Sequence, residues 1–107
     1  GGGGSGGGGG GMCGTASITQ TATTASDGHT HIPTDPTMLM TLKNDLKTLI
    51  NGAMSTMDFT LPMDKSHTHT IKLTAQQVTN LKAGMMVTGI VSTGPNHTHT
   101  YTIGCTT

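Results

Sequence analysis

The sequence predicts a small α+β domain, in which a threonine-rich antiparallel sheet packs with one long and one short helix. Three observations predict this fold class. The chain has 107 residues with 23 Thr and 2% aromatic residues, and β-branched threonine suits a half-exposed strand. Several short segments alternate apolar and polar residues, and one segment repeats leucine at helical spacing. We expect a single domain over residues 12–107, preceded by a glycine-rich arm, residues 1–11.

The long helix is predicted over residues 36–51. Asp35 can cap its N-terminus, and Pro36 suits the first turn, where a missing N–H costs nothing. Gly52 is expected to end the helix. Apolar side chains recur three or four residues apart on one face, which we expect to lie on the sheet: Leu39, Leu42, Leu46, Leu49 and Ile50.

The remaining elements follow from shorter patterns. Thr74 and Gln77 form a capping-box pattern, and Gly84 suits a C-terminal cap, so we expect a short helix over residues 75–83. Residues 13–26 are polar and are expected to form an exposed strand or a pair of short strands. Alternation or β-branched residues predict the other strands, over residues 56–62, 67–73, 85–91 and 97–103.

The two cysteines, Cys13 and Cys105, have neither zinc-motif nor CxxC spacing. A structural disulfide is the favoured interpretation, and two unrelated buried thiols are the alternative. The bond would close a loop of about 90 residues and stabilise the fold by about 4 to 5 kcal/mol. It also predicts an oxidising location, outside the cell or at its surface.

The charge pattern excludes one class of partner. Five Lys balance five Asp, with no Arg and no Glu, so the formal net charge is zero. A nucleic-acid ligand is excluded because phosphate binding needs clustered positive charge. No apolar run approaches the ~20 residues of a transmembrane helix, and no signal-peptide pattern is present. The chain as given is expected to be soluble or already processed.

The histidines form the most specific pattern in the chain. All six lie in three copies of one tripeptide, His-Thr-His, at residues 29–31, 67–69 and 97–99. Residues two apart in an extended strand point to the same face, so each copy presents two imidazoles together. In the second and third copies the same parity continues into apolar residues, which predicts that the rings face inward.

Such a cluster needs a shared partner, because neutral rings compete for donors and charged rings repel one another. The sequence therefore predicts a transition-metal site, with copper or zinc preferred and iron or nickel as alternatives. Four rings would give a tetrahedral or square site, and six would give an octahedron. The candidate ligands are His29, His31, His67, His69, His97 and His99.

Two further groups of residues are candidates for supporting roles. Asp27 and Asp64 precede histidine pairs and can orient imidazole N–H groups, although turn formation explains them more simply. Methionine pairs suggest a copper(I) site, Met54 with Met57 or Met85 with Met86. Core filling is the favoured role of methionine here, since Met38, Met57 and Met63 fall among core or turn positions.

An enzyme is not expected. The chain has no nucleophile elbow, no HExxH, no phosphate-binding loop and no Glu. A metal hydrolase is a distant alternative, since it needs an open coordination position and a nearby general base.

The arm GGGGSGGGGGG holds ten of the 17 glycines. It has three interpretations: an engineered linker, a spacer that tethers the domain to a lipid anchor upstream of residue 1, or extended glycine segments that pack in an assembly. Self-association into a homopolymer is favoured, because a net charge near zero offers little repulsion.

Residues 67–105 resemble a pattern found in uncharacterised bacterial secreted or lipoprotein-like proteins. It comprises an HxH strand, an LT.AQ...L.AG helix, a VT strand and a second HxH strand that ends near a cysteine. The resemblance implies export and metal binding but no activity. A looser similarity is to phage tail-fibre tips, in which HxH pairs from three chains surround one metal.

These expectations combine into one function. The sequence predicts a secreted, disulfide-linked structural protein that binds a transition metal and assembles into an extracellular filament or surface array. The alternative is a monomeric envelope protein that sequesters or delivers copper or zinc, with the arm as its tether.

Overall fold

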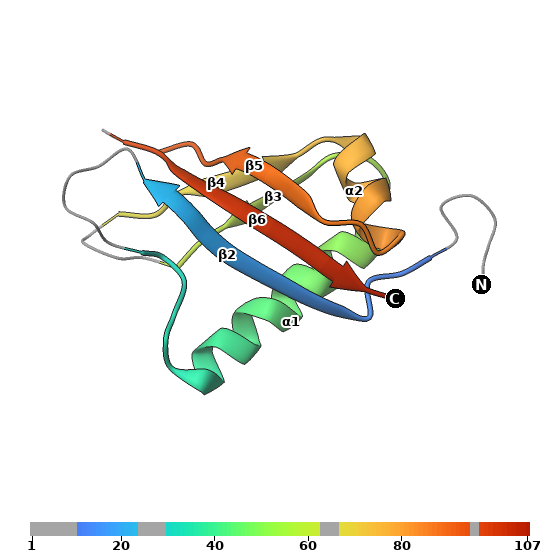
Figure 1. Ribbon diagram of the computed structural model, residues 1–107, viewed down its shortest axis with the longest axis horizontal. Coiled ribbons are helices and arrows are strands. Elements are labelled where there is room, and N and C mark those ends of the chain that lie inside the picture. The colour runs from blue at the N-terminus through green and yellow to red at the C-terminus, as the bar shows by residue number, and fades with distance from the viewer. Residues whose placement is uncertain (1–10, 24–29, 63–66, 95–96) are drawn as a thin grey trace.

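The computed structural model describes residues 11–23, 30–62, 67–94 and 97–107. Within these ranges the chain forms two helices and five strands, which confirms the α+β class (Figure 1). In chain order the elements are β2 (Thr15–Thr23), α1 (Pro36–Gly52), β3 (Met57–Thr60), β4 (Thr70–Leu73), α2 (Ala75–Lys82), β5 (Val87–Val91) and β6 (His99–Thr106). The predicted glycine-rich arm lies outside the described residues, apart from Gly11.

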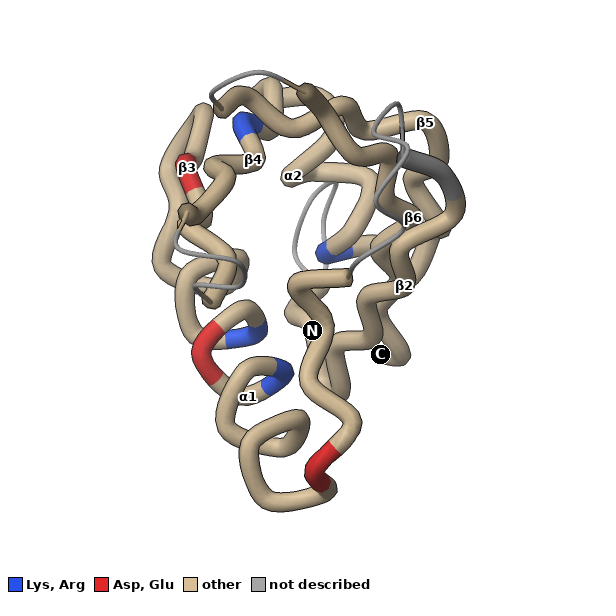
Figure 2. Tube along the Cα trace, turned by 90° about the vertical axis from the view of Figure 1, so that its left-hand side faces the viewer, with Lys and Arg blue, Asp and Glu red and all other residues tan. Residues whose placement is uncertain are grey.

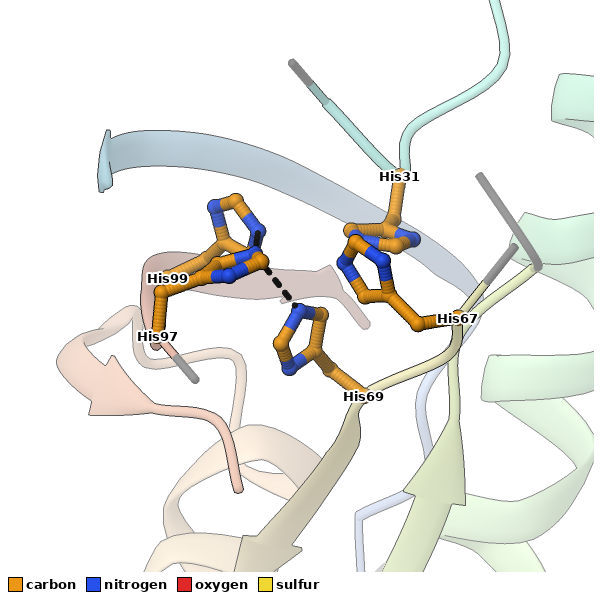
Figure 3. A group of neighbouring side chains, drawn as sticks. All are labelled: His31, His67, His69, His97 and His99. Atoms are coloured by element: carbon orange, nitrogen blue, oxygen red, sulfur yellow. Dashed lines mark hydrogen bonds between the residues drawn. The ribbon is translucent and has the colours of Figure 1, made fainter. Parts of the chain in front are cut away.

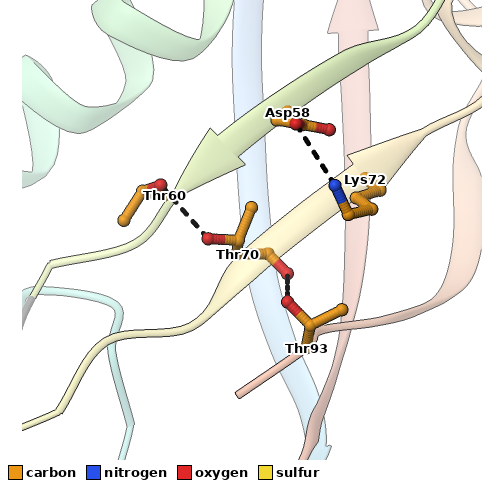
Figure 4. Close-up of polar contacts among 5 residues, drawn as sticks. All are labelled: Asp58, Thr60, Thr70, Lys72 and Thr93. Carbon is orange, nitrogen blue, oxygen red and sulfur yellow. Dashed lines mark hydrogen bonds and ion pairs between the residues drawn. The ribbon is translucent and has the colours of Figure 1, made fainter.

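The strands form two antiparallel sheets, β2-β6-β5 and β3-β4. A bridge between Thr70 and Thr93 joins the two sheets at one end. The Thr70 N–H donates to the Thr93 carbonyl at 3.2 Å, and the Thr93 N–H donates back at 2.8 Å. Threonine hydroxyls reinforce the joint, with Thr60 and Thr70 3.2 Å apart and the Thr93 hydroxyl donating to the Thr70 carbonyl (Figure 4). The start of β4 is therefore fixed beside the end of β5.

Helix α1 begins where the sequence predicts. The Asp35 carboxylate accepts from the backbone N–H groups of Thr37 and Met38, at 2.9 and 3.0 Å. The helix packs against β2 and β3. It ends at Gly52, one residue beyond the prediction. Leu42, Leu46 and Ile50 are buried, Leu39 is half-buried, and Leu49 is exposed.

Helix α2 is held by the predicted capping box. The Thr74 hydroxyl accepts from the Gln77 N–H at 3.1 Å, and the Gln77 side chain accepts from the Thr74 N–H at 2.9 Å. The helix ends at Lys82, and Gly84 follows with a positive φ of 85°, which glycine adopts without strain.

Strand parity is also confirmed. Ile71 and Leu73 of β4 face the core, as do Tyr101 and Ile103 of β6. Lys72 points outward and lies 3.3 Å from Asp58, an exposed pair that adds little stability (Figure 4). The expectation of an exposed first strand was wrong on one face: Ala16 and Ile18 of β2 are 2% and 3% exposed, because one side of this strand covers the core.

The two cysteines form the predicted disulfide. Cys13 lies just before β2 and Cys105 near the end of β6, so the bond joins these two places. Asn51 adds a second link at the same end of the molecule. Its side-chain oxygen accepts from the Cys13 N–H at 2.7 Å, and its amide donates to the Cys13 carbonyl at 2.9 Å. The beginning of the described chain is thus tied both to β6 and to the last turn of α1.

The prediction that methionine fills the core was wrong at most of the described positions. Met57 is buried at 8% exposure, but Met38 is 57% exposed. Leucine and isoleucine supply most of the core, so little space remains for methionine. The other exposed methionines are Met12, Met40, Met54, Met85 and Met86. Met63 lies outside the described residues.

Charged side chains lie on only part of the surface. Within the described ranges they belong to α1 and its N-cap, β3, β4 and α2, whereas β2, β5 and β6 carry none (Figure 2). The outer face of the larger sheet is therefore uncharged and rich in threonine. Neither described helix has the length and apolar character needed to cross a membrane.

Candidate metal centre

Five of the six predicted histidine ligands converge at one end of the molecule (Figure 3). Their donor nitrogens all lie within 4.8 Å of one another. They come from three segments: the loop before α1, the approach to β4, and the approach and start of β6. The five are His31, His67, His69, His97 and His99. The sixth predicted ligand, His29, lies outside the described residues.

Backbone pairing explains how two of these segments meet. Ser92, at the end of β5, donates its N–H to the His99 carbonyl at 2.9 Å, and its hydroxyl accepts from the His99 N–H at 3.1 Å. The neighbouring residue, Thr93, pairs with Thr70, which directly follows His69. Residues 92–93 therefore pair with β4 on one side and with β6 on the other. The histidine of each strand lies on its inward face, so both histidines point into the same space.

A third set of contacts holds His31. Its backbone N–H donates to the side-chain oxygen of Gln20 at 3.3 Å, and the same oxygen accepts from the Tyr101 hydroxyl at 3.1 Å. Burial raises the pKa of Tyr101, so this hydroxyl stays protonated as a donor. Gln20 thus links β2, β6 and the loop that carries His31. No sequence pattern signals this role, because Gln20 is one polar residue among many in a threonine-rich strand.

Backbone carbonyls fix two of the rings in the form that binds metal. The Nδ1 atom of His69 lies 2.9 Å from the Thr93 carbonyl oxygen, and Nδ1 of His31 lies 2.7 Å from the Pro62 carbonyl oxygen. A carbonyl only accepts, so each Nδ1 carries the proton and each Nε2 keeps its lone pair for the centre. Metal-bound histidines are oriented in the same way.

Two carboxylates were candidates for this supporting role, although turn formation was the favoured interpretation of both. Asp27 and Asp64 lie outside the described residues. Carbonyl groups fill the role for His31 and His69, and every residue has a carbonyl, so no residue type in the sequence signals it.

Gly94 allows the chain to pass directly over His69. A Cβ atom placed on Gly94 would overlap the Nδ1 atom of His69 and crowd two carbons of the same ring. Only glycine leaves room here for the ring to reach the Thr93 carbonyl. The requirement arises from a contact between residues 25 positions apart, so the sequence alone does not reveal it.

The contacts among the donor atoms favour a cation over a proton. His97 Nε2 lies 3.2 Å from His69 Nε2 and 3.1 Å from His99 Nε2. Since the lone pair of His69 already points inward, a single proton on His97 would have to serve both neighbours. A second proton, on Nε2 of His99, would point two N–H groups at each other. One metal ion accepts all of these lone pairs at once.

Electrostatics also keep His69 neutral and ready to bind. Its pKa is lowered by burial first, and then by the neighbouring rings of His31, His67 and His97, against an opposing hydrogen bond to Thr93. The described cluster contains no carboxylate and no thiolate. Imidazole alone suits a transition metal, whereas Ca²⁺ and Mg²⁺ require oxygen ligands.

The cluster is more buried on one side than on the other. His31, His69 and His99 are 2%, 1% and 0% exposed, whereas His67 and His97 are half-buried. A cavity of about 360 Å³ lies beside the loop that precedes α1. Of the five rings only His31 lines it, so it flanks the cluster without opening into its centre.

No protein-family model, curated protein sequence or solved structure matches this chain. The resemblance of residues 67–105 to bacterial secreted proteins, and the looser one to phage tail-fibre tips, therefore stay predictions. The site itself stands on its geometry: five histidines that can hold a transition-metal ion, in a disulfide-linked fold that fits an extracellular protein.

Proposed function

We propose that this chain is an exported structural protein that holds a transition-metal ion through its His-Thr-His pairs and assembles into an extracellular filament or surface array. One observation carries the metal-binding part: five imidazoles from three distant segments converge with donor nitrogens no more than 4.8 Å apart. Burying so many rings together is costly without a shared partner. Copper, zinc, iron and nickel all accept imidazole nitrogen.

The ligand set is supplied by one chain. His29 is the expected sixth ligand, because it lies two residues before His31, with the spacing of the other two pairs. A second copy of the chain is then not needed to complete the site. Assembly, in this proposal, occurs through other surfaces, and the metal stabilises the subunit.

Two features support export and assembly. The disulfide favours an oxidising environment, because cytosolic thiols are kept reduced. The uncharged outer face of β2, β6 and β5, together with a net charge of zero, offers little electrostatic resistance to contact between copies. The glycine arm, residues 1–11, is the proposed point of contact or tether.

We also propose that the centre is not catalytic. The described cluster offers no carboxylate to act as a general base, and the chain contains no Glu. With five or six imidazoles around one ion, few positions remain for a substrate. This separates the proposed structural role from a metal hydrolase.

The alternative function is a monomeric envelope protein that sequesters or delivers metal. The observation that favours it is the same intrachain convergence, because one chain suffices for binding. The two proposals differ in the state of the protein in solution and share the metal site.

Metal content tests the shared part. We expect the oxidised protein from its native source to contain about one equivalent of transition metal by elemental analysis. The double variant His67→Ala/His69→Ala is expected to contain almost none, while Thr68→Ala, between these two histidines, retains it. Circular dichroism confirms that the variants are folded. Equal metal content in all three proteins contradicts the site.

Assembly is tested separately. Size-exclusion chromatography and electron microscopy of the full chain, compared with a variant lacking residues 1–11, distinguish the two functions. Filaments or large oligomers that depend on the arm support the structural protein. A monomer in both cases supports the sequestering protein.

A further inference from the structure

We infer that the five histidines occupy five corners of an octahedron, with His69 opposite the sixth corner, and that the site therefore selects a six-coordinate divalent ion such as Ni²⁺ over Zn²⁺. The inference rests on the proposed metal binding and adds its geometry and its preferred ion.

The contacts among the rings carry the inference. Almost every pair of the five described rings meets edge to face, with centroids 4.6–5.0 Å apart. Two pairs are the exceptions: His31 with His97, and His67 with His99. His69 belongs to neither exception, so its ring contacts all four of the others (Figure 3).

This pattern distinguishes between coordination geometries. Ligands at neighbouring corners of an octahedron touch, and ligands at opposite corners do not. Five ligands on an octahedron have two opposite pairs that share no member, and one ligand adjacent to all others. A trigonal bipyramid has only one opposite pair, and a tetrahedron has none and holds four ligands. The observed contacts match the octahedron, with His31 opposite His97, His67 opposite His99, and His69 alone on its axis.

Distances between donor atoms agree with this assignment. With metal–nitrogen bonds of about 2.1 Å, neighbouring nitrogens lie about 3.0 Å apart in an octahedron and about 3.4 Å apart in a tetrahedron. The Nε2 atom of His97 lies 3.2 Å from that of His69 and 3.1 Å from that of His99, and both are neighbouring pairs in the assignment. Opposite nitrogens would lie about 4.2 Å apart in the octahedron. The donor nitrogens lie within 4.8 Å of one another, so the most distant ones would approach by about half an ångström on binding.

Burial gives an independent check. The three buried rings, His31, His69 and His99, are mutual neighbours and so define one triangular face of the octahedron. The opposite face must then consist of His97, the sixth corner and His67. These two rings are the half-buried ones, and they contact each other. The sixth corner therefore lies on the half-buried side of the cluster.

The geometry determines which ions fit. Zn²⁺ has no geometric preference of its own and usually binds four nitrogen or sulfur ligands in a tetrahedron. Cu²⁺ favours tetragonal sites, with longer bonds along one axis. Ni²⁺ and Fe²⁺ gain ligand-field stabilisation in a regular octahedron of nitrogens. The described ligands are all neutral, so no negative charge in the cluster offsets a third positive charge, which favours the divalent state.

Cobalt(II) is the probe that reports the geometry directly. It is added, in the absence of oxygen, to the full-length metal-free protein with its disulfide intact. We expect one equivalent to bind with the weak visible absorption of six-coordinate cobalt. The intense blue absorption of tetrahedral cobalt would overturn the inference while leaving metal binding intact. Failure to bind any ion would overturn the proposed function as well, which separates the two results.

Competition between nickel and zinc tests selectivity. We expect Ni²⁺ to displace Zn²⁺ from the wild-type protein when both are present at equal concentration, since a tetrahedral site would retain zinc. The variant His69→Ala is expected to lose this preference, because it removes the ligand that contacts all the others. Thr100→Ala, on the opposite face of β6 from His99, is the matched control and is expected to keep it. Zinc retention by the wild-type protein would count against the octahedron.

Discussion

The two ends of strand β6 hold the molecule together by different chemistry. At the C-terminal end, Cys105 is joined covalently to Cys13, and Asn51 ties the same region to α1. At the N-terminal end, about 20 Å away along the strand, His99 lies among four other imidazoles. Both sites bring distant segments together, and both use residues that share the inward face of β6.

The difference teaches how each end responds to its surroundings. The disulfide depends on redox conditions and is insensitive to moderate changes of pH. The histidine cluster depends on metal concentration and pH, because protons and metal ions compete for the same nitrogens. Under the proposed function, the disulfide end stays closed in an oxidising environment, whereas the histidine end responds to metal concentration and pH. Independent perturbation of the two ends tests this comparison.

The largest effect is expected at the disulfide. The double variant Cys13→Ala/Cys105→Ala should lower the free energy of unfolding by about 4 to 5 kcal/mol, because a loop of 92 residues is no longer closed in the unfolded chain. Urea denaturation of the metal-free protein measures this loss. Whatever fraction stays folded should still bind metal with unchanged stoichiometry. A loss below about 1 kcal/mol would contradict the dominant role of this cross-link.

The next effect concerns the backbone beside the histidine cluster. Gly94→Ala places a methyl group where the His69 ring lies, so the ring must move away from the Thr93 carbonyl. We expect metal affinity to fall by about 10- to 100-fold, the usual cost of losing an outer hydrogen bond to a metal ligand. Isothermal titration with nickel measures it.

Gly52→Ala is the matched control for this variant. Gly52 ends α1, and no atom lies within 4 Å of a Cβ added there. Its affinity for nickel should equal that of the wild-type protein. Equal affinity in the Gly94→Ala variant would show that His69 is not held through this contact.

Much of the fold, and the identity of the candidate ligands, could be predicted from the sequence. Local patterns predicted the caps of both helices and the inward parity of β4 and β6, because each depends on residues a few positions apart. The two cysteines, which lack metal-motif and CxxC spacing, indicated a disulfide, and the three His-Thr-His copies that hold every histidine indicated a metal site. The alternation of inward and outward side chains along each strand also predicted correctly that these histidines face inward.

The features that position those histidines were not predictable. Gln20, the Pro62 carbonyl and Gly94 act through contacts across 11 to 31 residues of sequence. Nothing local distinguishes them from other turn or strand residues. The exposed methionines were misassigned because composition reports how many apolar residues exist but not which of them the helices and strands turn toward the core.

A smaller effect is expected from acid on the metal-free protein. The pKa of His69 in the folded state is lowered below its ordinary value of 6.5, by burial first and by neighbouring rings second. The unfolded chain therefore takes up a proton more readily than the folded one. Stability should be complete above pH 6.5 and should decline as the pH falls through that value.

Urea denaturation between about pH 7.5 and pH 5 measures this decline. Bound nickel should move the decline to lower pH, because the ion holds the nitrogens against protons. The disulfide-free variant should show the same slope, since the two ends are separate. A stability that rises on acidification would contradict the assignment of His69 as a buried neutral ring.

The smallest effect is expected at Tyr101, which lies between the two ends of β6. Tyr101→Phe keeps the buried ring and removes the hydroxyl that donates to Gln20. The Gln20 oxygen still accepts from the His31 N–H, so no acceptor loses its last donor. We expect a loss of about 1 kcal/mol in the free energy of unfolding.

Nickel affinity should fall by less than tenfold in this variant, because His31 keeps its bond to the Pro62 carbonyl. Losing an outer hydrogen bond to a metal ligand would cost about tenfold or more. Gln20→Ala should weaken binding more than Tyr101→Phe does, since it removes the acceptor of the His31 N–H itself. Equal effects of the two substitutions would mean that Gln20 supports the core through Tyr101 and does not position the metal ligand.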